Sequence, residues 1–545
     1  MKLSTLLLSV TFIIFTLTGC KKTVAPEVAP ASVSIDPASL NLTKGFILAD
    51  IRQLKAIVTN ASGSSDVVWS SEDSRIATVT ADGRVTAVGG GETNIVAKLV
   101  NGTATAKCKV TVTDEDDYKY RLVLKDKGNS GYSINNPGDF LSAKAIARRR
   151  KMNIPIDETD LPISSDYIKA IQNVGGIIVA QSKWLKTVSV HCTDKFLIDK
   201  YKALPFVKDV VLVWEGKRST SGTPAKYIDV PQAGAPQTVA APLDYGSATG
   251  NITMNNGQAL HNQGYKGAGI DIAVIDGGFI GLKANPMFNN ISIKGAKSFV
   301  YENPDPYSID SHGVWVTSCM AVNKPGNYVG TAPEANYWLF RTEDESSEFP
   351  IEEDYWVNAI EYADSVGVDI VNSSLYYTNG YYIPSARYTF NNMDGQTALA
   401  TRAANMAFNK GIFIVCCAGN EQQWVGTPAD SPDVLTVGSV TSRSIIDNFT
   451  SWGITVDGRM KPDVVALGGG AWVVNTSGTT EQRSGTSYSS PIVCGLVACL
   501  WQAYPQLSNK NLLDIMRHSA DRYNNPIVPY GYGIPNMQLA ITYAQ

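Results

Sequence analysis

The sequence predicts three folded regions of different classes: an all-β sandwich, a small α+β segment and an α/β domain. Residues 31–113 consist of short Val/Ile/Thr-rich runs separated by turn residues, which is the spacing of an antiparallel sandwich. Over residues 117–215, strand-like alternation and helix-like periodicity follow one another. The nearly all-apolar run 270–275 ends in Asp276, as a buried parallel strand of an α/β domain does.

The composition supports large folded cores. The chain has 545 residues, of which 44% are hydrophobic, 9% aromatic and 18% charged. This composition excludes wholesale disorder, and the length indicates about three or four domains. The 46 Lys and Arg residues against 50 Asp and Glu residues leave a net charge of −4, which argues against a nucleic-acid partner.

The N-terminus carries a targeting signal. Lys2 precedes an apolar run from Leu6 to Leu17, which is shorter than the roughly 20 residues needed to span a membrane, so residues 1–19 are predicted to be a signal peptide. The run closes with Gly19-Cys20, which resembles the cleavage motif of bacterial lipoproteins. That resemblance implies a lipid on Cys20, a tether over residues 20–30 and a membrane-anchored place in the cell envelope. An ordinary signal peptide with an incidental cysteine is the alternative.

The other cysteines do not form a disulfide pattern. Seven follow Cys20, an odd number, and they are scattered through apolar segments, as Cys494 and Cys499 are. We therefore expect buried thiols, even in an oxidising compartment.

The sandwich at residues 31–113 has recognisable local motifs. The strand start Trp69-Ser70-Ser71, the strand Ala77-Thr78-Val79 and the hairpin at 83–87 resemble the bacterial immunoglobulin-like group 2 domain. The region contains no paired acid, base or nucleophile. We expect a spacer or adhesive module.

The α+β segment at residues 117–215 lies between an acidic run and a linker. The run Asp114-Glu115-Asp116-Asp117 is interpreted as a solvated boundary, and the basic run at 148–151 as a solvated helix face. Residues 216–250 are rich in Gly, Ser, Thr, Pro and Ala, which indicates a linker. The expected strands cover 118–124, 177–191 and 207–213, and the expected helices cover 141–152, 164–174 and 194–203.

Three separated segments carry the residues of interest for chemistry. Asp276 ends the apolar strand, His312 precedes the apolar helix-like run 314–321, and Ser487 precedes the apolar stretch 492–504. Each residue alone has an ordinary structural interpretation: a strand-end carboxylate, a satisfied core histidine and a helix N-cap.

Taken in the order Asp276, His312, Ser487, the segments resemble the subtilisin-like serine proteases over residues 251–545. The segment Cys417-Ala418-Gly419-Asn420-Glu421 is similar to the part of that family that carries the oxyanion asparagine. The resemblance implies a doubly wound, mostly parallel sheet and a serine endopeptidase acting on polypeptides. It also implies that the α+β segment is prodomain-like, inhibitory and cut within 216–250, or else permanently attached.

The proposed chemistry explains the residue types. A serine hydroxyl needs a base, here His312, and the imidazole needs an orienting carboxylate, here Asp276. The Asn420 amide and the Ser487 N–H are expected to stabilise the oxyanion. By similarity, an extended substrate binds along six residues, with Gly426 as the floor of the primary pocket and Tyr376, where Gly is usual, narrowing the cleft. These six residues are Ser374, Leu375, Tyr376, Ala418, Gly419 and Gly426.

Two other functions remain open at this stage. A non-catalytic adhesive lipoprotein would lack one of the four catalytic residues, and all four are present. A self-processing or peptide-ligating enzyme would use the same residues. No cofactor or catalytic metal is predicted; no Asp-rich loop has recognisable calcium-binding spacing, and a structural calcium ion is left open together with the oligomeric state.

Overall fold

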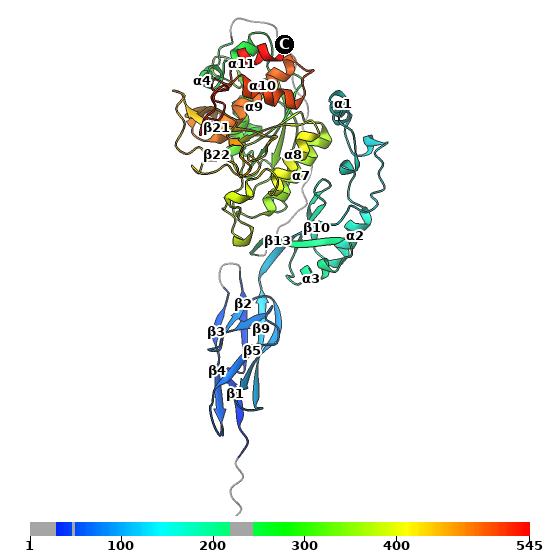
Figure 1. The fold of residues 1–545 in the computed structure, drawn as a ribbon, viewed down its shortest axis with the longest axis vertical. Coiled ribbons are helices and arrows are strands. Elements are labelled where there is room, and N and C mark those ends of the chain that lie inside the picture. Colours follow the sequence, from blue (N-terminus) through cyan, green and yellow to red (C-terminus); the bar gives the residue numbers. More distant parts are fainter. Residues whose placement is uncertain (1–28, 46–48, 218–242) are drawn as a thin grey trace, which may run out of the picture. The chain divides into compact units, whose positions relative to one another are not determined.

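The computed structural model describes residues 29–45, 49–217 and 243–545, and the chain divides into two compact units, up to Glu115 and from Asp116 onward (Figure 1). The predicted signal peptide, Cys20 and most of the predicted tether and linker lie outside the described residues. None of the described helices combines the length and the apolar character required to cross a membrane.

The regular elements of the first unit, over residues 29–45 and 49–115, are strands, whose inward side chains alternate with exposed ones. Leu42, Val85, Ile95 and Val110 are buried in its core. One sheet has the order β2 (Ser39–Lys44), β9 (Thr105–Asp114), β8 (Gly91–Leu99) and β5 (Val67–Ser71). The others pair β1 (Ser32–Asp36) with β4 (Lys55–Thr59), and β3 (Ile51–Gln53) with β7 (Arg84–Ala87) and β6 (Ala77–Val79).

The second unit begins with a small α+β domain. Its antiparallel sheet has the order β11 (Ile177–Ser182), β12 (Thr187–Cys192), β10 (Asp116–Leu124) and β13 (Val207–Lys217). Its helices are α1 (Ala143–Lys151), α2 (Ser165–Val174) and α3 (Leu197–Lys202). Leu122, Val188, Ile171 and Tyr201 lie in one buried cluster between sheet and helices.

Two sequence interpretations of this domain are wrong. Asp116 and Asp117 are buried in strand β10 rather than solvated, and Asp117 accepts a hydrogen bond from His191 at 3.0 Å. Arg148 and Arg149 are also buried, because both form ion pairs with the buried Asp364 of the following domain. A buried charge is tolerated when it is paired, and a partner more than 200 residues away leaves no local pattern.

The rest of the second unit is an α/β domain with a seven-stranded sheet. The strand order is β15 (Ser292–Ser298), β18 (Asn336–Arg341), β14 (Asp271–Asp276), β19 (Ile370–Ser373), β20 (Phe413–Cys417), β21 (Leu435–Thr441) and β24 (Val464–Gly469). Every neighbouring pair is parallel. The short strands at its margins are β16 (Asn323–Lys324), β17 (Tyr328–Val329), β22 (Gly453–Ile454), β23 (Met460–Lys461), β25 (Ala471–Val474) and β26 (Thr480–Arg483).

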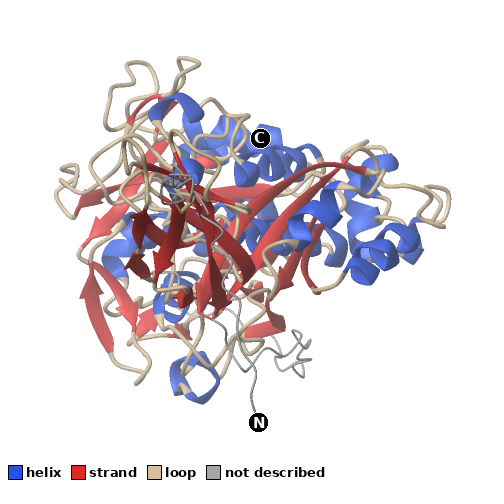
Figure 2. Cartoon of the chain, turned by 90° about the horizontal axis from the view of Figure 1, so that it is seen from below, coloured by secondary structure: helices blue, strands red, loops and turns tan. Residues whose placement is uncertain are grey.

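Helices cover both faces of this sheet, so the expected doubly wound arrangement is confirmed (Figure 2). Alternate residues of β14 show why: Ile272 and Val274 belong to one buried cluster, and Ala273 and Ile275 belong to the other. The first cluster contains residues of α6 (His312–Ala321), α9 (Thr486–Ala503), α10 (Asn509–His518), α11 (Met537–Ala544) and α5 (Gln258–His261). The second contains residues of α7 (Ile351–Val366) and α8 (Leu399–Asn409), while α4 (Thr249–Thr253) precedes the sheet.

The strand order places a switch point at β14. The chain runs from β14 to the edge strand β15, returns through β18, and then continues on the other side of β14 with β19. In doubly wound sheets, ligands bind beyond the carboxyl ends of the strands at such a point. Asp276 is the last residue of β14 and therefore lies at this position.

The α+β domain packs on helix α7 through buried polar contacts. The Arg121 Nε and Nη2 groups donate to Asp354, at 2.7 and 2.6 Å. The backbone N–H groups of Lys183 and Trp184 donate to the Glu361 carboxylate at 3.0 and 3.1 Å. These bonds tie the sheet of the small domain to the larger one.

The seven cysteines of the described residues are free and buried, as the sequence predicts. Burial raises the pKa of the Cys319 thiol to about 12 and raises that of Cys494 as well. They are part of the packed interior, including Cys416 and Cys417 in strand β20.

Candidate active site

The structure brings Asp276 and His312 together. Asp276 ends the central strand β14 and is fully buried, while His312 is the first residue of α6. The His312 Nδ1–H donates to Asp276 Oδ1 at 2.8 Å, and the same oxygen accepts from the Gly277 N–H at 2.8 Å. Asp310 holds the start of the helix, because its Oδ1 accepts from the His312 backbone N–H at 2.9 Å. The imidazole is thus fixed in one tautomer, with Nε2 left for other chemistry.

The pairing changes the proton affinity of both groups. Burial disfavours the charged imidazole, but the adjacent Asp276 carboxylate outweighs burial and raises the pKa of His312 to about 9. Burial also raises the pKa of Asp276, and the His312 charge opposes that rise. Only an ionised Asp276 can stabilise the imidazolium. The raised pKa of His312 therefore describes the pair with Asp276 ionised.

Ser487 lies at the start of the buried helix α9, as its position before an apolar stretch predicts. Its hydroxyl donates to the Ser374 carbonyl at 3.5 Å and does not hydrogen-bond to His312, although the structure describes both residues. Hydrogen bonds of this kind are often loose in a free site and tighten when substrate binds. Among the described residues, the Ser487 backbone N–H has no acceptor, as the first N–H groups of a helix commonly lack one.

Asn420 follows strand β20 and faces the start of the same helix. Its Oδ1 accepts from both the N–H and the hydroxyl of Thr486, each at 2.9 Å. These two bonds fix the amide plane, and within the described residues its Nδ2 group has no hydrogen bond. Asn420 is exposed, so its amide Nδ2 group is open to a ligand.

The segment expected to bind substrate is held close to these residues. Ser374 donates from its hydroxyl to the Ser487 carbonyl at 3.0 Å. Tyr377 and Thr427 exchange two backbone hydrogen bonds, which brings Gly426 against Tyr376. A Cβ on Gly426 would lie 2.8 Å from the Tyr377 carbonyl oxygen, so this position requires glycine.

Two other residues expected to bind substrate, Ala418 and Gly419, already donate backbone hydrogen bonds within the fold. The Ala418 N–H donates to Val437 at 3.0 Å, and Gly419 donates to the Thr486 hydroxyl at 3.2 Å. Gly419 has φ +106° and a Cβ there would lie 2.9 Å from the Ser451 hydroxyl, so only glycine fits. These two residues build the wall behind Asn420.

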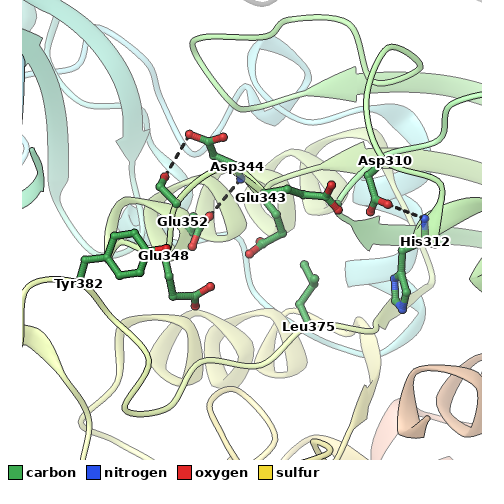
Figure 3. Close-up of a pocket in the computed structure, with 11 residues that line it drawn as sticks. Asp310, His312, Glu343, Asp344, Glu348, Glu352, Leu375 and Tyr382 are labelled. Carbon is green, nitrogen blue, oxygen red and sulfur yellow. Dashed lines mark hydrogen bonds between the residues drawn. The ribbon is translucent and has the colours of Figure 1, made fainter. Parts of the chain in front are cut away.

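A cavity that sequence analysis missed opens beside His312. It has a volume of about 350 Å³ and is lined largely by carboxyl groups, and we call it the acidic cavity (Figure 3). Its lining consists of Gly277, Asp310, His312, Glu343, Asp344, Glu345, Ser347, Glu348, Glu352, Leu375 and Tyr382. The acidic stretch between β18 and α7 is visible in the sequence, but only the fold brings it to His312.

No metal centre is evident in the part of the chain that the structure describes. No group of three or more His, Cys, Asp or Glu side chains is placed there to hold a metal ion. The carboxylates of the acidic cavity are therefore not arranged as a coordination site.

Three family models match successive parts of the chain. Residues 30–110 match the bacterial Ig-like domain of group 2, and residues 119–226 match the peptidase S8 propeptide domain of Bacteroidota. Residues 267–534 match the subtilase family. The immunoglobulin-like and prodomain-like resemblances of the sequence are confirmed by these matches.

Curated relatives align with the α/β domain. Subtilisin E of Bacillus subtilis (strain 168) is 29% identical over 296 residues, which cover 53% of this chain and 70% of the relative. Subtilisin DY of Bacillus licheniformis is 28% identical over 297 residues, 53% of this chain and 97% of the relative. A thermostable alkaline protease of Halalkalibacterium halodurans is 25% identical over 361 residues, 66% of this chain and 89% of the relative.

Proposed function

Because this chain belongs to the subtilase family of serine peptidases through residues 267–534, we propose that it hydrolyses peptide bonds with Asp276, His312 and Ser487. The observation that carries the proposal is the 2.8 Å bond from His312 Nδ1 to Asp276 at the switch point of the sheet, beside the start of α9. His312 Nε2 takes the Ser487 proton as the hydroxyl attacks the substrate carbonyl, and the imidazolium then protonates the leaving amine. Water hydrolyses the acyl-enzyme by the same route in reverse.

Two backbone and side-chain donors stabilise the oxyanion in this mechanism. The Asn420 Nδ2 group and the Ser487 N–H have no acceptor among the described residues, so both are open to a developing negative charge. Donors fixed before the reaction need no reorganisation, and one such donor lowers the activation barrier by about 2.7 to 4 kcal/mol.

The proposal is tested by covalent labelling with a fluorophosphonate probe, which reacts with an activated serine. We expect labelling of the natural chain and none of Ser487→Ala. Ser484→Ala is the matched control, because that hydroxyl lies on the same loop and only accepts from the Gly470 N–H at 3.0 Å. Equal labelling of natural and Ser487→Ala protein would contradict the assignment of Ser487 as nucleophile.

The propeptide domain is proposed to keep the enzyme latent. Its contacts with α7, from Arg121 to Asp354 and from Arg149 to Asp364, support tight docking. Its last strand β13 is linked to the acidic cavity through aromatic contacts. The ring centroid of Trp214 lies 5.9 Å from that of Phe349, and the ring centroid of Phe349 lies 5.3 Å from that of Tyr382. These contacts support the proposal that a cut within 216–250 frees the cleft.

N-terminal sequencing of purified protein tests this latency. We expect an active catalytic fragment that begins within 216–250, whereas Ser487→Ala stays joined to its propeptide. An active natural chain that retains the propeptide would support the alternative of a permanently attached domain.

The place of the enzyme is proposed to be the cell envelope, with a lipid on Cys20. The support is the Gly19-Cys20 sequence after a short apolar run. Incorporation of a labelled fatty acid tests it: Cys20→Ser should abolish the label and release the protein from membranes. Labelling that persists in Cys20→Ser would refute this anchor.

A further inference from the structure

The acidic cavity contains a buried carboxyl oxygen without a partner. Glu352 is 2% exposed and sits in the first turn of α7. Its Oε1 accepts from the Asp344 N–H at 3.0 Å, but its Oε2 has no hydrogen bond among the described residues. Figure 3 shows the carboxyl groups of Glu343, Glu348 and Glu352 around the same space, opposite Leu375. An unsatisfied buried oxygen facing a cavity indicates a missing donor.

Among the described residues, no Lys or Arg side chain lines this cavity, although the buried Arg341 interacts electrostatically with Glu343 and Glu345. Glu348 and Glu352 form no ion pair within the described residues. Arg341 lies behind the lining, and its guanidinium donates to the carbonyls of Gly277 and Asn303 at 2.8 and 3.0 Å. The remaining positive group is His312, which Asp276 already pairs.

Crowding of the carboxyl groups is reflected in their proton affinity. Burial, with nearby carboxylates, raises the pKa of Glu343 to about 8 and that of Glu345 to about 7. Burial raises the pKa of Glu348 as well, with Glu421 as a further cause. A cation placed in the cavity would offset this repulsion and let the carboxyl groups ionise.

The position of the cavity identifies the kind of cation. Leu375 belongs to the segment beside Ser487 along which substrate is expected to lie, and His312 forms the other end of the lining. The lining groups do not form a metal-binding cluster. A long side chain with a terminal cation can enter from the peptide and reach Glu352, whereas an ion would need converging ligands.

We propose that the acidic cavity is a specificity subsite that binds a lysine or arginine side chain of the polypeptide substrate through Glu348 and Glu352. The inference rests on the proposed peptidase function and names its substrate class: polypeptides with a basic residue at one position near the scissile bond.

The test compares fluorogenic peptides that differ at one position. Each position on both sides of the cleaved bond carries lysine, arginine, norleucine or glutamine, and kcat/KM is measured with the processed natural enzyme. We expect one position at which lysine or arginine is preferred over norleucine by roughly 10- to 100-fold, as for a desolvated charge-assisted contact. Equal rates for lysine and norleucine at every position would overturn the inference.

Variants then assign the preference to the cavity. The double variant Glu348→Gln, Glu352→Gln should reduce the lysine-to-norleucine ratio toward 1, and this ratio does not depend on how much protein is folded. Glu334→Gln removes one carboxylate near the opposite end of the sheet, just before β18, and should keep the natural ratio. A ratio that survives in the double variant would overturn the inference.

The following outcomes distinguish the proposed subsite from the proposed peptidase function. Hydrolysis of norleucine peptides that depends on Ser487, without any preference for basic residues, contradicts the subsite and leaves the peptidase intact. Absence of Ser487-dependent hydrolysis of all peptides would overturn both. Saturable calcium binding that disappears in the double variant, together with no preference for lysine, would replace the basic side chain by a metal ion.

Discussion

Three consecutive acidic residues at the start of helix α7 have three different environments. Asp354 pairs with Arg121 of the propeptide domain, and Glu353 accepts from the Tyr381 and Tyr388 hydroxyls at 2.9 and 2.7 Å. Glu352 faces the acidic cavity with one oxygen unpartnered. Because neighbouring positions of one helix point to different sides, a single acidic run serves both the propeptide interface and the catalytic side.

The propeptide interface and the acidic cavity differ in the source of the positive partners for their carboxyl groups. The propeptide interface carries its own cations, so its carboxylates are satisfied before any substrate arrives. In the acidic cavity, Glu348 and Glu352 have no ion-pair partner among the described residues, and we propose that the substrate supplies it. The following predictions test whether carboxylates paired within the protein behave differently from those of the acidic cavity.

The largest effect is expected where a buried carboxylate is paired with the proposed general base. Asp276→Asn keeps the shape but removes the charge that orients and stabilises His312, so kcat should fall by about 10⁴-fold. The measurement is hydrolysis of a neutral peptide by equal amounts of folded natural and Asp276→Asn protein. A loss below about tenfold would show that pairing at Asp276 is structural only.

The next effect concerns the propeptide interface. Asp354→Ala leaves Arg121 buried without its carboxylate, which should lower the free energy of unfolding of the joined chain by about 3–5 kcal/mol. Urea unfolding is measured in the Ser487→Ala background, so that self-cleavage does not intervene. The double variant Arg121→Met, Asp354→Leu is the control and should recover most of the loss. Equal losses in single and double variants would contradict the importance of the pair.

The pH dependence of kcat/KM reports the His312 and Asp276 pair. A base must be neutral to accept a proton, so with the pKa of His312 raised to about 9, activity should be full above that pH. It should fall about tenfold per unit below it. Asp276→Asn should move this acid limb to lower pH, because the charge that raises the pKa of His312 is gone. An unmoved limb would assign the titration to another group.

The smallest effect is expected in the acidic cavity without substrate. Burial and Glu343 raise the pKa of Glu352, so the unfolded chain loses this proton at lower pH than the folded chain does. Stability therefore falls as pH rises above about 4.5, and Glu352→Gln should recover about 1 to 2 kcal/mol of this loss. Urea midpoints at pH 5 and pH 8 measure it, with Glu334→Gln as control. A destabilised Glu352→Gln at pH 8 would indicate a structural partner for Glu352.

Sequence alone predicted the parts of the molecule that local pattern determines. Asp276, His312 and Ser487 each stand next to an apolar run, so the ends of a buried strand and two buried helices could be located from periodicity. The doubly wound sheet followed from the family resemblance, and strand β14 followed from the apolar run 270–275.

The failures came from partners distant in the chain. Arg148 and Arg149 have the pattern of a solvated helix face, and only docking against Asp364 buries them. Glu352 looks like an ordinary acidic residue at a helix N-terminus, where a carboxylate is favourable in any case. Its unpartnered oxygen and the neighbours that shape the acidic cavity are products of the tertiary fold.

The reactivity of the buried free thiols reports whether the protein is folded. A thiol reacts as the thiolate, and burial raises the pKa of Cys319 and Cys494, which are fully buried. These thiols are therefore protected from oxidants and alkylating dyes in the folded enzyme, and unfolding of the domain that holds them exposes them. The rate at which such a dye reacts measures how often the domains open, which is also the rate at which oxidative damage accumulates during the enzyme's life.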